Sequence, residues 1–594
     1  MNAIALLNRA LGQACVAHLA AAGVERAVIS PGSRNTPLVL AIDAEPRIES
    51  HVVLDERVAG FVALGMAKAS GKPTLLLCTS GSAAAHYLPA VIEASHARLP
   101  LIIVSADRPL ELHYSGAPQT TEQADLFGVH VRASLCLDAP CAPWDEGWLA
   151  TQLARVVDSA VGVLPGPVHI NIPLREPLWV PGLVRAASVT HRHRVVVRSA
   201  STLPAAVLKP FVERWCSTPR GLIVYGPEPG ATESSQTNPC IVELAEALGW
   251  PVLADPLCQL RYGSKDSCII GSYDLILRQP DIAAELKPDY VLRFGHAPTS
   301  KRLNLWLQSQ TCDSALVDPC GSWHDFNHKA HTLLISQTQS LCKTALESIR
   351  VTSSLEKDRA WLERWQQAEG VAIGAIAQEQ ETFWGGTVAQ TVMRCLPEAA
   401  ALFVASSMPV RHLDSFTHHS PTQPRIYGNR GVNGIDGSVA TALGISAVRH
   451  KAGMGPTVAL IGDLALIHDA GGLLAAGQSN VPLTLVIINN QGGGIFRQLP
   501  ISQHPHALER YFTTPQKVDL RALGNAAGAH YSQVENIAGL QSALDRNIKR
   551  HGLKIIEAKV DPHVEQQERQ RVLALVQNTL SEKLTHQPNP GELQ

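Results

Sequence analysis

Short apolar runs alternate along the chain with longer Ala- and Leu-rich stretches that have a helical period. The apolar runs predict strands at 26–30, 74–78, 101–105, 222–225, 289–294, 457–461 and 483–488. Strands that alternate with helices in this way are typical of parallel sheets covered by helices on both faces. The pattern therefore predicts an α/β fold built from doubly wound parallel sheets.

Two parts of the chain repeat the same order of features. Residues 63–65 read ALG, and a strand, a polar turn, a helix and a Pro-Leu pair before a second strand follow. Residues 442–444 also read ALG and begin the same order. The Thr74-to-Pro100 spacing is 26 residues, and the matching Thr457-to-Pro482 spacing is 25. This repeat predicts two similarly folded α/β domains, one at each end.

A third region lies between the two copies, with its own strand–helix alternation from 221 to about 345. A polar, basic stretch at 190–203 precedes it, and a charged, helical connecting stretch at 352–382 follows it. The predicted divisions are a first domain at 1–190, a middle domain at 191–355, a last domain at 356–580 and a polar, frayed tail at 581–594.

Composition adds limits to this picture. A chain of 594 residues has room for three or four domains. Hydrophobic residues make up 45% and charged residues 17%, which is typical of a globular protein with a large core. The net charge is −2, so no overall field attracts nucleic acid or an anionic membrane.

The ends and the cysteines indicate a cytoplasmic protein without a membrane span. The apolar N-terminus carries Arg9 and has helical periodicity, but it lacks the pattern of a signal peptide. The other apolar runs, such as LIIVSA, are far shorter than the ~20 residues that a span needs. The 12 cysteines are scattered without a C-x-x-C pair, which favours reduced thiols.

The stretch 462–496 carries the most informative chemistry. One predicted strand ends at Gly462 and Asp463, and the next ends at Asn490, followed by Gly492. Ligands of open α/β sheets bind beyond the carboxyl ends of strands, so these residues are expected to meet. The Asp463 carboxylate, the Asn490 amide and the Gly492 carbonyl would suit Mg²⁺, or Mn²⁺, shared with a diphosphate. The alternative is a glycine-rich turn with a surface Asn pair.

This stretch resembles the diphosphate-and-metal motif of thiamine-diphosphate-dependent enzymes. In that motif Gly-Asp is followed, after about 25–30 residues, by Asn-Asn. The family usually has Gly after the Asp, whereas this chain has Leu464, a change that leaves the ligands intact. The resemblance implies that thiamine diphosphate and a divalent metal are the cofactors.

A second piece of the resemblance lies in the first copy, where Glu56 opens an apolar helix. Packed against Val58, Phe61 and Val62, its carboxylate would be partly desolvated, which favours the protonated form. In thiamine-diphosphate enzymes, a similar Glu bonds the pyrimidine ring and promotes the tautomer whose nitrogen removes the C2 proton. The alternative is a first-turn Glu that stabilises the helix dipole.

Cations and small polar residues in strand-end loops form a third feature. Arginines flanked by Gly, Ser and Asn suit bidentate binding of carboxylates, although surface arginines are usually only solvated. The candidate substrate-binding residues are Ser33, Arg34, Arg108, Lys301, Arg302, Ser407, Arg411 and Arg430, and Gln119 is a further candidate.

The motifs SPGSRNTPL, DERVAGFVALGMAK, ADRP, GAPQ, NRGVNGIDG and NNQGGGIF together resemble the menaquinone-pathway carboligases of this superfamily. The resemblance implies decarboxylation of 2-oxoglutarate and 1,4-addition of the succinyl semialdehyde unit to isochorismate. Both substrates are dicarboxylates, so arginines that bind carboxylates would be needed to hold them. It further implies a homodimer, or a dimer of dimers, in which two chains hold each cofactor, and a middle domain without a cofactor of its own.

The resemblance also assigns residues. Glu56 and Gln119 are implied as catalytic, and Asp463, Asn490 and Gly492 as metal ligands. The implied cofactor contacts are Glu56, Thr79, Ser80, Gly81, Gly434, Ile435, Gly462, Asp463, Asn490, Gly492, Ile495 and Phe496. Ile435 would prop the thiamine in its bent shape, and a plain core isoleucine is the alternative.

Other interpretations remain open. A pyruvate-using carboligase, similar to acetohydroxyacid synthase, is the nearest enzymatic alternative, but one carboxylate would not need so many arginines. A catalytically inactive paralogue that acts as a scaffold is the alternative outside enzymes. His324, His328 and His331 have helical spacing, but a polar surface loop is favoured over a zinc site.

Overall fold

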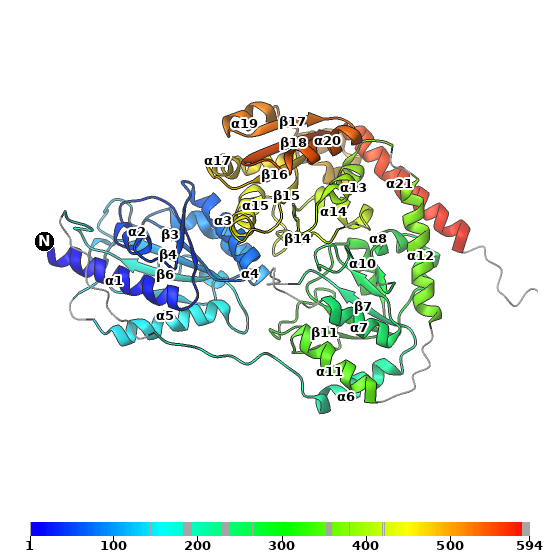
Figure 1. The fold of residues 1–594 in the computed structure, drawn as a ribbon, viewed down its shortest axis with the longest axis horizontal. Coiled ribbons are helices and arrows are strands. Elements are labelled where there is room, and N and C mark those ends of the chain that lie inside the picture. The colour runs from blue at the N-terminus through cyan, green and yellow to red at the C-terminus, as the bar shows by residue number, and fades with distance from the viewer. Residues whose placement is uncertain are drawn as a thin grey trace, which may run out of the picture.

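The computed structural model describes residues 2–141, 144–181, 193–228, 238–263, 267–351, 359–378, 381–418, 420 and 422–584. Three α/β domains follow one another along the chain (Figure 1). The first (blue and cyan) lies to the left, the middle domain (green) to the lower right, and the last (yellow to orange) above them.

Each domain is built around one parallel sheet of six strands. The first sheet contains β1 (Arg26–Ile29), β2 (Glu49–Val52), β3 (Thr74–Cys78), β4 (Leu101–Asp107), β5 (Ser134–Cys136) and β6 (Val168–Pro173). The second contains β7 (Gly221–Tyr225), β8 (Val252–Ala254), β9 (Ile269–Ile270), β10 (Tyr290–Phe294), β11 (Asp313–Val317) and β12 (Thr332–Leu334). The third contains β13 (Ala401–Val404), β14 (Arg425–Tyr427), β15 (Thr457–Gly462), β16 (Leu483–Asn489), β17 (His530–Val534) and β18 (Leu553–Lys559).

The strand orders confirm the predicted fold class and the internal repeat. The first sheet has the order β2-β1-β3-β4-β6-β5, and the last has β14-β13-β15-β16-β18-β17, which is the same order within its domain. The middle sheet, β12-β11-β10-β7-β8-β9, instead has the order of dinucleotide-binding folds. The first and last domains are therefore copies of one architecture, and the middle domain is a different one.

All seven strands predicted from the apolar runs are present, and most are completely buried. They are the central strands, which must be apolar on both faces because helices cover both sides of the sheet. The pattern missed the edge strands β2 and β5, whose burial alternates or is partial, and also interior strands such as β6 and β18, which are almost completely buried. Edge strands need less apolar surface, so their sequences carry a weaker signal.

Helices cover both faces of each sheet. In the first domain they are α1 (Asn2–Ala21), α2 (Thr36–Asp43), α3 (Glu56–Ser70), α4 (Leu88–Ala97) and α5 (Glu146–Val161). In the middle region they are α6 (Ala205–Cys216), α7 (Asn238–Leu248), α8 (Tyr273–Ile276), α9 (Pro280–Glu285), α10 (Lys301–Ser309), α11 (Thr338–Val351) and α12 (Ala360–Ala377). In the last they are α13 (Gly385–Cys395), α14 (Met408–Phe416), α15 (Ser438–Lys451), α16 (Asp463–His468), α17 (Ala470–Gln478), α18 (Pro505–Leu508), α19 (Leu520–Ala526), α20 (Ile537–Asn547) and α21 (Pro562–Leu584).

The repeated ALG motif lies where the two copies meet. Helices α3 and α15 pack against each other, and their backbones approach closely at the two glycines. A Cβ on Gly65 would lie 2.1 Å from the Thr441 carbonyl oxygen, and a Cβ on Gly444 would lie 2.0 Å from the Val62 carbonyl oxygen. Only glycine allows this approach, so the motif recurs because each copy contributes one helix to the same crossing.

Helix α1 is the one described helix that is long and apolar enough, over Ala3–Ala21, to cross a membrane. In the structure, 56% of that window is buried, and α1 packs against α2 and α5. Leu11, Val16 and Leu19 belong to the hydrophobic core on the outer face of the first sheet. The apolar composition of α1 is therefore accounted for by its packing in the core.

The connections follow the sequence prediction in part. The described residues of the basic stretch, 193–203, form an extended connection without helix or strand. Residues 190–192, 352–358 and 379–380 lie outside the described part of the chain, and between the latter two α12 is helical as predicted. The domain limits at 190, 355 and 580 stay a prediction.

The prediction of a frayed polar tail at 581–594 was wrong at its start. Helix α21 continues to Leu584, and Leu580 and Leu584 are buried. Helix α21 packs beside α12 (Figure 1), and Gln577 donates to the Arg278 carbonyl of the middle domain at 2.9 Å. The packing against α12 buries the apolar side chains at the end of α21, and the local sequence does not reveal this partner. Residues 585–594 lie outside the described part.

Candidate active site

The residues predicted to bind the metal and the diphosphate lie together at the carboxyl edge of the third sheet. Strands β15 and β16 are neighbours, with Gly462 opposite Ile488, so Asp463 and Asn490 leave the sheet side by side. The chain turns back after Asn490, and the Gly492 N–H donates to the Asp463 carboxylate at 2.7 Å. The sequence prediction that the two strand ends meet is confirmed by this register.

The donors at this edge fit a divalent cation. Asp463 is only 6% exposed, and burial raises the pKa of its carboxyl to about 6, against the opposing effect of the Leu464 and Gly492 N–H groups. A bound cation would favour the ionised form. Among the described residues no three His, Cys, Asp or Glu side chains gather at one point, so amide and carbonyl oxygens would complete the ligands.

The loop after Asn490 brings its backbone close to neighbouring segments. Gly492 has a φ of 126°, and a Cβ there would lie 2.2 Å from the Thr513 carbonyl oxygen. Gly493 N–H donates to that same carbonyl at 2.8 Å. Phe496 contacts Phe512 at a centroid distance of 5.4 Å, while Ile495 and Phe496 remain half-buried. The glycines are therefore required by the fold of this loop.

The first sheet gathers its own predicted residues at its carboxyl edge. Ser33 and Arg34 follow β1, Thr79 to Gly81 follow β3, and Arg108 follows β4. The Arg34 N–H donates to Thr79 Oγ1 at 3.3 Å, and a Cβ on Gly81 would lie 3.4 Å from Gln119. Residues from four separate motifs thus meet at one edge.

Glu176, which the sequence reading did not single out, already contacts the two arginines of this edge. The buried Arg34 side chain donates to Glu176 Oε1 at 2.7 Å and to the Leu174 carbonyl at 2.8 Å. Arg108 lies 3.5 Å from the same carboxylate. Glu176 follows β6, so it reaches this edge for the same topological reason as the arginines. In this structure Glu176 balances part of their charge.

Glu56 is the first residue of α3, four residues beyond the end of β2. The preceding residue, Asp55, caps the helix by accepting from the Arg57 N–H at 2.9 Å. The Glu56 side chain is therefore not used for capping. It is half-buried, with Val58, Phe61 and Val62 behind it in the core.

Ser407, Arg411 and Arg430 come together at the edge of the third sheet. Arg411 Nη1 donates to the Ser407 carbonyl at 2.5 Å, and Arg430 Nη1 contacts Ser406 Oγ at 3.4 Å. Burial lowers the pKa of each arginine, and the charge of Arg430 lowers the pKa of Arg411 further. Neither arginine has a carboxylate ion pair among the described residues. Two neighbouring cations of this kind would bind an anion.

Two side chains of the first domain hold the loop that carries Arg430, and the sequence analysis missed both. The buried carboxylate of Glu93 on α4 accepts from the Gly431 and Val432 N–H groups, each at 2.8 Å. Lys68 on α3 donates to the Gly428 carbonyl at 2.8 Å. These contacts span more than 330 positions in sequence, and no local motif announces them.

Lys301 and Arg302 lie exposed in the first turn of α10 in the middle domain. Ser300, the N-cap of that helix, donates to Asp274 Oδ1 at 2.6 Å, and Ser415 of α14 donates to Asp274 Oδ2 at 2.9 Å. Asp274 therefore ties the helix with Lys301 and Arg302 to the helix with Arg411. No local sequence motif marks Asp274 for this role.

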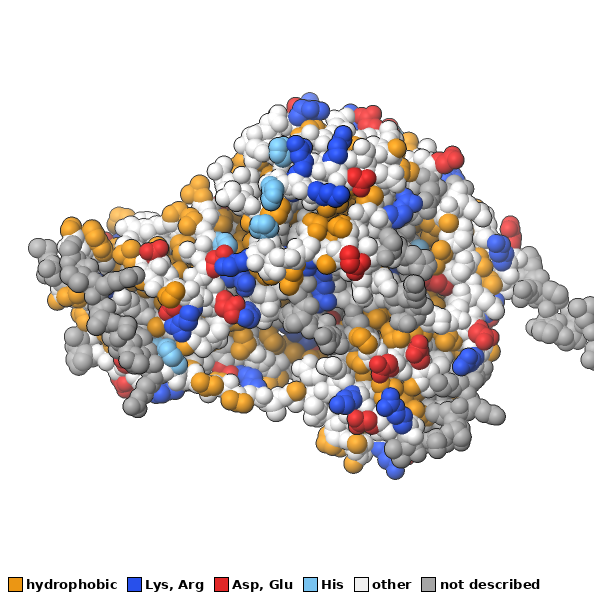
Figure 2. Space-filling view, in the orientation of Figure 1, with side chains coloured by type: hydrophobic (Ala, Val, Ile, Leu, Met, Phe, Trp, Pro, Cys, Tyr) orange, Lys and Arg blue, Asp and Glu red, His pale blue; other side chains and the backbone are white. Residues whose placement is uncertain are grey.

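A cavity of about 240 Å³ adjoins the predicted metal edge. Asn490, Gly494 and Met408 line it, together with three arginines that the sequence reading missed, Arg278, Arg497 and Arg569. Burial lowers the pKa of Arg569 to about 10, and its guanidinium lies 5.3 Å from the centre of the Phe416 ring. Figure 2 shows Lys and Arg side chains (blue) in the hollow where the domains meet.

The predicted residues form two sets within one chain. No hydrogen bond or ion pair between described residues joins Glu56, Arg34 or Gln119 to Asp463 or Asn490. Gly434 and Ile435 lie half-exposed just before α15, so Ile435 is not a core residue. His324, His328 and His331 lie in a loop between β11 and β12, as favoured over a helical zinc site.

The fold and the edge sites together define a thiamine-pyrophosphate enzyme. Three family models match in order: "Thiamine pyrophosphate enzyme, N-terminal TPP binding domain" at 9–126, "Middle domain of thiamine pyrophosphate" at 191–404, and "Thiamine pyrophosphate enzyme, C-terminal TPP binding domain" at 411–558. A solved thiamin diphosphate-dependent enzyme of Mycobacterium smegmatis shares the fold, with a TM-score of 0.70 and 19% identity, covering 92% of this chain and 98% of that one.

Closer relatives narrow the family. A 2-succinyl-5-enolpyruvyl-6-hydroxy-3-cyclohexene-1-carboxylate synthase of Geobacillus kaustophilus is 40% identical, covering 92% of this chain and 94% of its own length. The same-named protein of Listeria monocytogenes is 38% identical, covering 96% and 97%. The chain belongs to the family of 2-succinyl-5-enolpyruvyl-6-hydroxy-3-cyclohexene-1-carboxylate synthases.

Proposed function

We propose that the protein is a transferase that decarboxylates 2-oxoglutarate and adds its succinyl semialdehyde unit to isochorismate, with thiamine diphosphate and Mg²⁺ or Mn²⁺ as cofactors. The observation that carries the proposal is the arrangement of two groups at the third sheet. Asp463 and Asn490 lie side by side at its edge, and Arg411 and Arg430, which form no ion pair with a described carboxylate, lie at the same sheet. The relatives' name supports the product. Both substrates bring two carboxylates to a site rich in arginine.

The residues divide into holding and binding roles. The Asp463 carboxylate, the Asn490 amide and the Gly492 carbonyl would hold the metal, and the metal would hold the diphosphate. When bound, thiamine diphosphate supplies the electron sink that stabilises the charge left by carbon dioxide. Glu56 would hold a proton at the pyrimidine end, and Gln119 would offer its amide beside Gly81.

The arginines would bind and orient the substrate carboxylates. A hydrogen bond to a charged group contributes about 1.5–3 kcal/mol, and more where water is excluded. Arg411 and Arg430 are supported most directly, because they repel each other until an anion binds. Arg34 and Arg108 share Glu176, so a substrate carboxylate would have to displace Glu176 or bind beside it.

We also propose a cytoplasmic homodimer as the active unit. The separation of the Glu56 set from the Asp463 set within one chain supports a site completed by a second copy. The scattered cysteines support a reducing compartment. Pairing of dimers into a tetramer would be a further step that the site does not require.

One incubation tests the function. The purified protein receives thiamine diphosphate, Mg²⁺, 2-oxoglutarate and isochorismate, and mass spectrometry identifies the product. We expect the mass of the 2-succinyl product, and none with excess chelator. A clear preference for pyruvate over 2-oxoglutarate would favour an acetohydroxyacid-synthase-like activity instead. Loss of all turnover in a folded, cofactor-binding protein would favour an inactive paralogue.

A further inference from the structure

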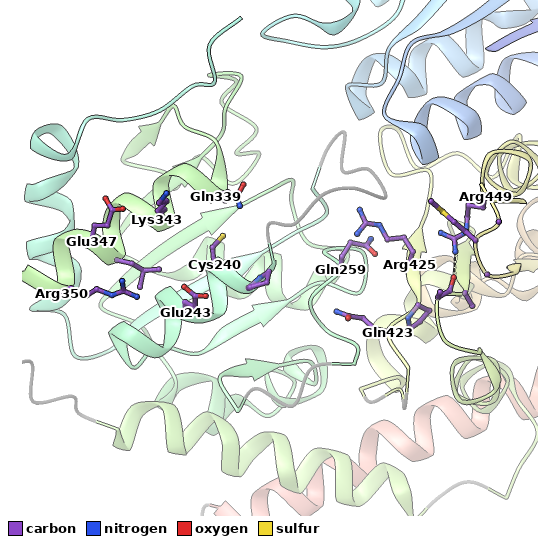
Figure 3. A pocket seen from close by; sticks show the side chains of 18 residues that line it. Cys240, Glu243, Gln259, Gln339, Lys343, Glu347, Arg350, Gln423, Arg425 and Arg449 are labelled. Atoms are coloured by element: carbon purple, nitrogen blue, oxygen red, sulfur yellow. Dashed lines mark hydrogen bonds between the residues drawn. The ribbon is translucent and has the colours of Figure 1, made fainter. Parts of the chain in front are cut away.

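A cavity of about 870 Å³ lies between the middle and last domains, away from the site described above. Helices α7 and α11 form one wall, and the start of β14 with the end of α15 forms the other (Figure 3). None of the predicted catalytic, cofactor or substrate residues lines it. Its volume falls within the range of about 300–1,000 Å³ that small-molecule pockets occupy.

Cations face this cavity from both walls (Figure 3). Lys343 and Arg350 come from α11, and Arg425 and Arg449 come from the last domain. Two carboxylates, Glu243 and Glu347, line the middle-domain wall, so among the described lining residues cations exceed anions by two. In the part of the chain that the structure describes, Lys343, Arg350 and Arg425 form no ion pair. The lining therefore has an excess of positive charge that a bound anion would neutralise.

Arg425 carries the strongest evidence for a ligand. Its Nε and Nη2 atoms are buried and have no hydrogen-bond partner among the described residues. Buried guanidinium groups are normally paired, as Arg98 is with Asp318 at 2.6 Å in this protein. An unsatisfied charged donor is costly, so this side chain fits a position that a ligand completes.

Arg425 is also joined to the substrate side of the last domain. Strand β14 has only three residues, with Arg425 at its start, and the Gly428–Arg430 segment follows its end. Gln259, which lines the cavity, clamps the strand: its amide donates to the Ile426 carbonyl at 2.6 Å and accepts from the Ile426 N–H at 2.9 Å. A ligand on Arg425 and Gln259 would therefore act on the strand that positions Arg430.

We propose that this cavity is a second binding site, for a small organic anion that carries two or more carboxylate or phosphate groups. Arg425 and Lys343 bind the anion from opposite walls, and occupancy shifts the position of Arg430 through β14. The binding is independent of the proposed function. The effect on Arg430 rests on that function, since it concerns the KM for a dicarboxylate substrate.

Calorimetry on the cofactor-loaded protein tests the binding, with benzene-1,3,5-tricarboxylate and inorganic phosphate as probes. We expect one of them to bind, with an affinity about tenfold or more weaker in Arg425→Gln and in Lys343→Gln. Lys343 is exposed on α11, so its variant tests the site even if Arg425→Gln folds poorly. The matched controls Arg546→Gln, exposed on α20, and Arg411→Gln should bind as the wild type does.

The possible results separate the sites. Binding of the tricarboxylate alone identifies a carboxylate ligand, and binding of phosphate identifies a phosphate ligand. Equal affinity in wild type, Arg425→Gln and Lys343→Gln overturns the proposal, as does failure of both probes at millimolar concentration. Loss of binding in Arg411→Gln would locate the probe at the substrate arginines and would also overturn it. An unchanged substrate KM with the probe bound would overturn the link through β14 alone.

Discussion

At the scale of single residues, burial and charge decide which groups can do chemistry. Asp463 is held at a sheet edge where burial raises its pKa to about 6, and the neighbouring N–H groups only partly oppose this. Arg411 and Arg430 are desolvated beside each other. By contrast, the Asp55 carboxylate forms an ion pair with Arg57 and caps α3. Glu56 is the other carboxylate of this turn, and it does not cap the helix.

Glu56→Gln should nearly abolish turnover while the protein stays folded. Glutamine keeps the size and a hydrogen bond but cannot exchange a proton, and proton-transfer roles contribute about 10²–10⁴-fold. Turnover is measured with both substrates, and cofactor binding by calorimetry is the control. A folded variant that keeps more than about a tenth of wild-type turnover would remove Glu56 from this role.

His169 gives a pH dependence of stability. It is buried between Ser105, 2.7 Å away, and Phe127, and burial lowers its pKa to about 4. Its unfolded-state pKa is higher, so unfolding takes up a proton below about pH 6.5, and stability falls as the pH falls. His169→Gln should remove about 2 kcal/mol of the loss between pH 7 and pH 5. Thermal melting of the variant and the wild type at several pH values measures this difference. If the stability of both falls equally as the pH falls, His169 makes no such contribution.

At the scale of elements, the structure depends on helices from different domains that touch at a few points. The α3–α15 crossing needs glycine on both helices. The α8–α10–α14 contact needs a single carboxylate, Asp274, that accepts from two hydroxyls. Each contact fixes the position of a helix that begins or ends at the site, so each has a measurable consequence.

Gly444→Ala should destabilise the protein, because the new methyl group would lie 2.0 Å from the Val62 carbonyl oxygen and would force the helices apart. Overpacking of this kind costs about 1–3 kcal/mol. The matched control is Gly374→Ala on α12, where a Cβ meets nothing within 4 Å. Thermal melting should show a lower Tm for the first variant and an unchanged or higher Tm for the control. Equal Tm values would contradict a tight crossing.

Asp274→Asn should raise the KM for at least one dicarboxylate substrate by about tenfold, with cofactor affinity unchanged. Burial alone would raise the pKa of Asp274, but Arg278 and the Ser300 and Ser415 hydroxyls lower it overall, so the carboxylate is the form in use. Asp281→Asn, exposed on the adjacent α9, is the control. If both variants keep the wild-type KM, Asp274 does not position the cations of α10 and α14.

At the scale of the whole molecule, one chain carries both sets of predicted cofactor residues without joining them. Glu56 lies in the first domain, and Asp463 and Asn490 lie in the last. The two domains have the same strand order and pack through equivalent helices. A second copy of the chain would bring a first domain to a last domain and complete two sites.

Mixing two inactive variants tests this assembly. Glu56→Gln and Asp463→Ala should each be inactive alone, but a mixed dimer would have one site with both defects and one intact site. Equal amounts under subunit exchange should recover about a quarter of wild-type activity, if sites act independently. Mass spectrometry verifies exchange. Exchange without recovery would mean that each site is built within one chain.

The sequence by itself determined the α/β class, seven of the interior strands, the internal repeat and the residues at strand ends. These follow from local rules, since buried parallel strands must be apolar and their carboxyl ends must share an edge. The same rules brought Asp463 to Asn490 and Arg34 to Thr79. The order of the strands along the chain was enough for these pairs, because each pair follows strands that are neighbours in one sheet.

Only the tertiary structure decided the contacts that join distant segments. Glu93 binds a loop 338 positions away, and Arg569 reaches the cavity at the predicted metal edge from the C-terminal helix. The tail that the sequence reading expected to be frayed is helical through Leu584, because α12 supplies its apolar partner. Burial and charge pairing arise from the whole packed chain, so no local pattern of residues could encode them.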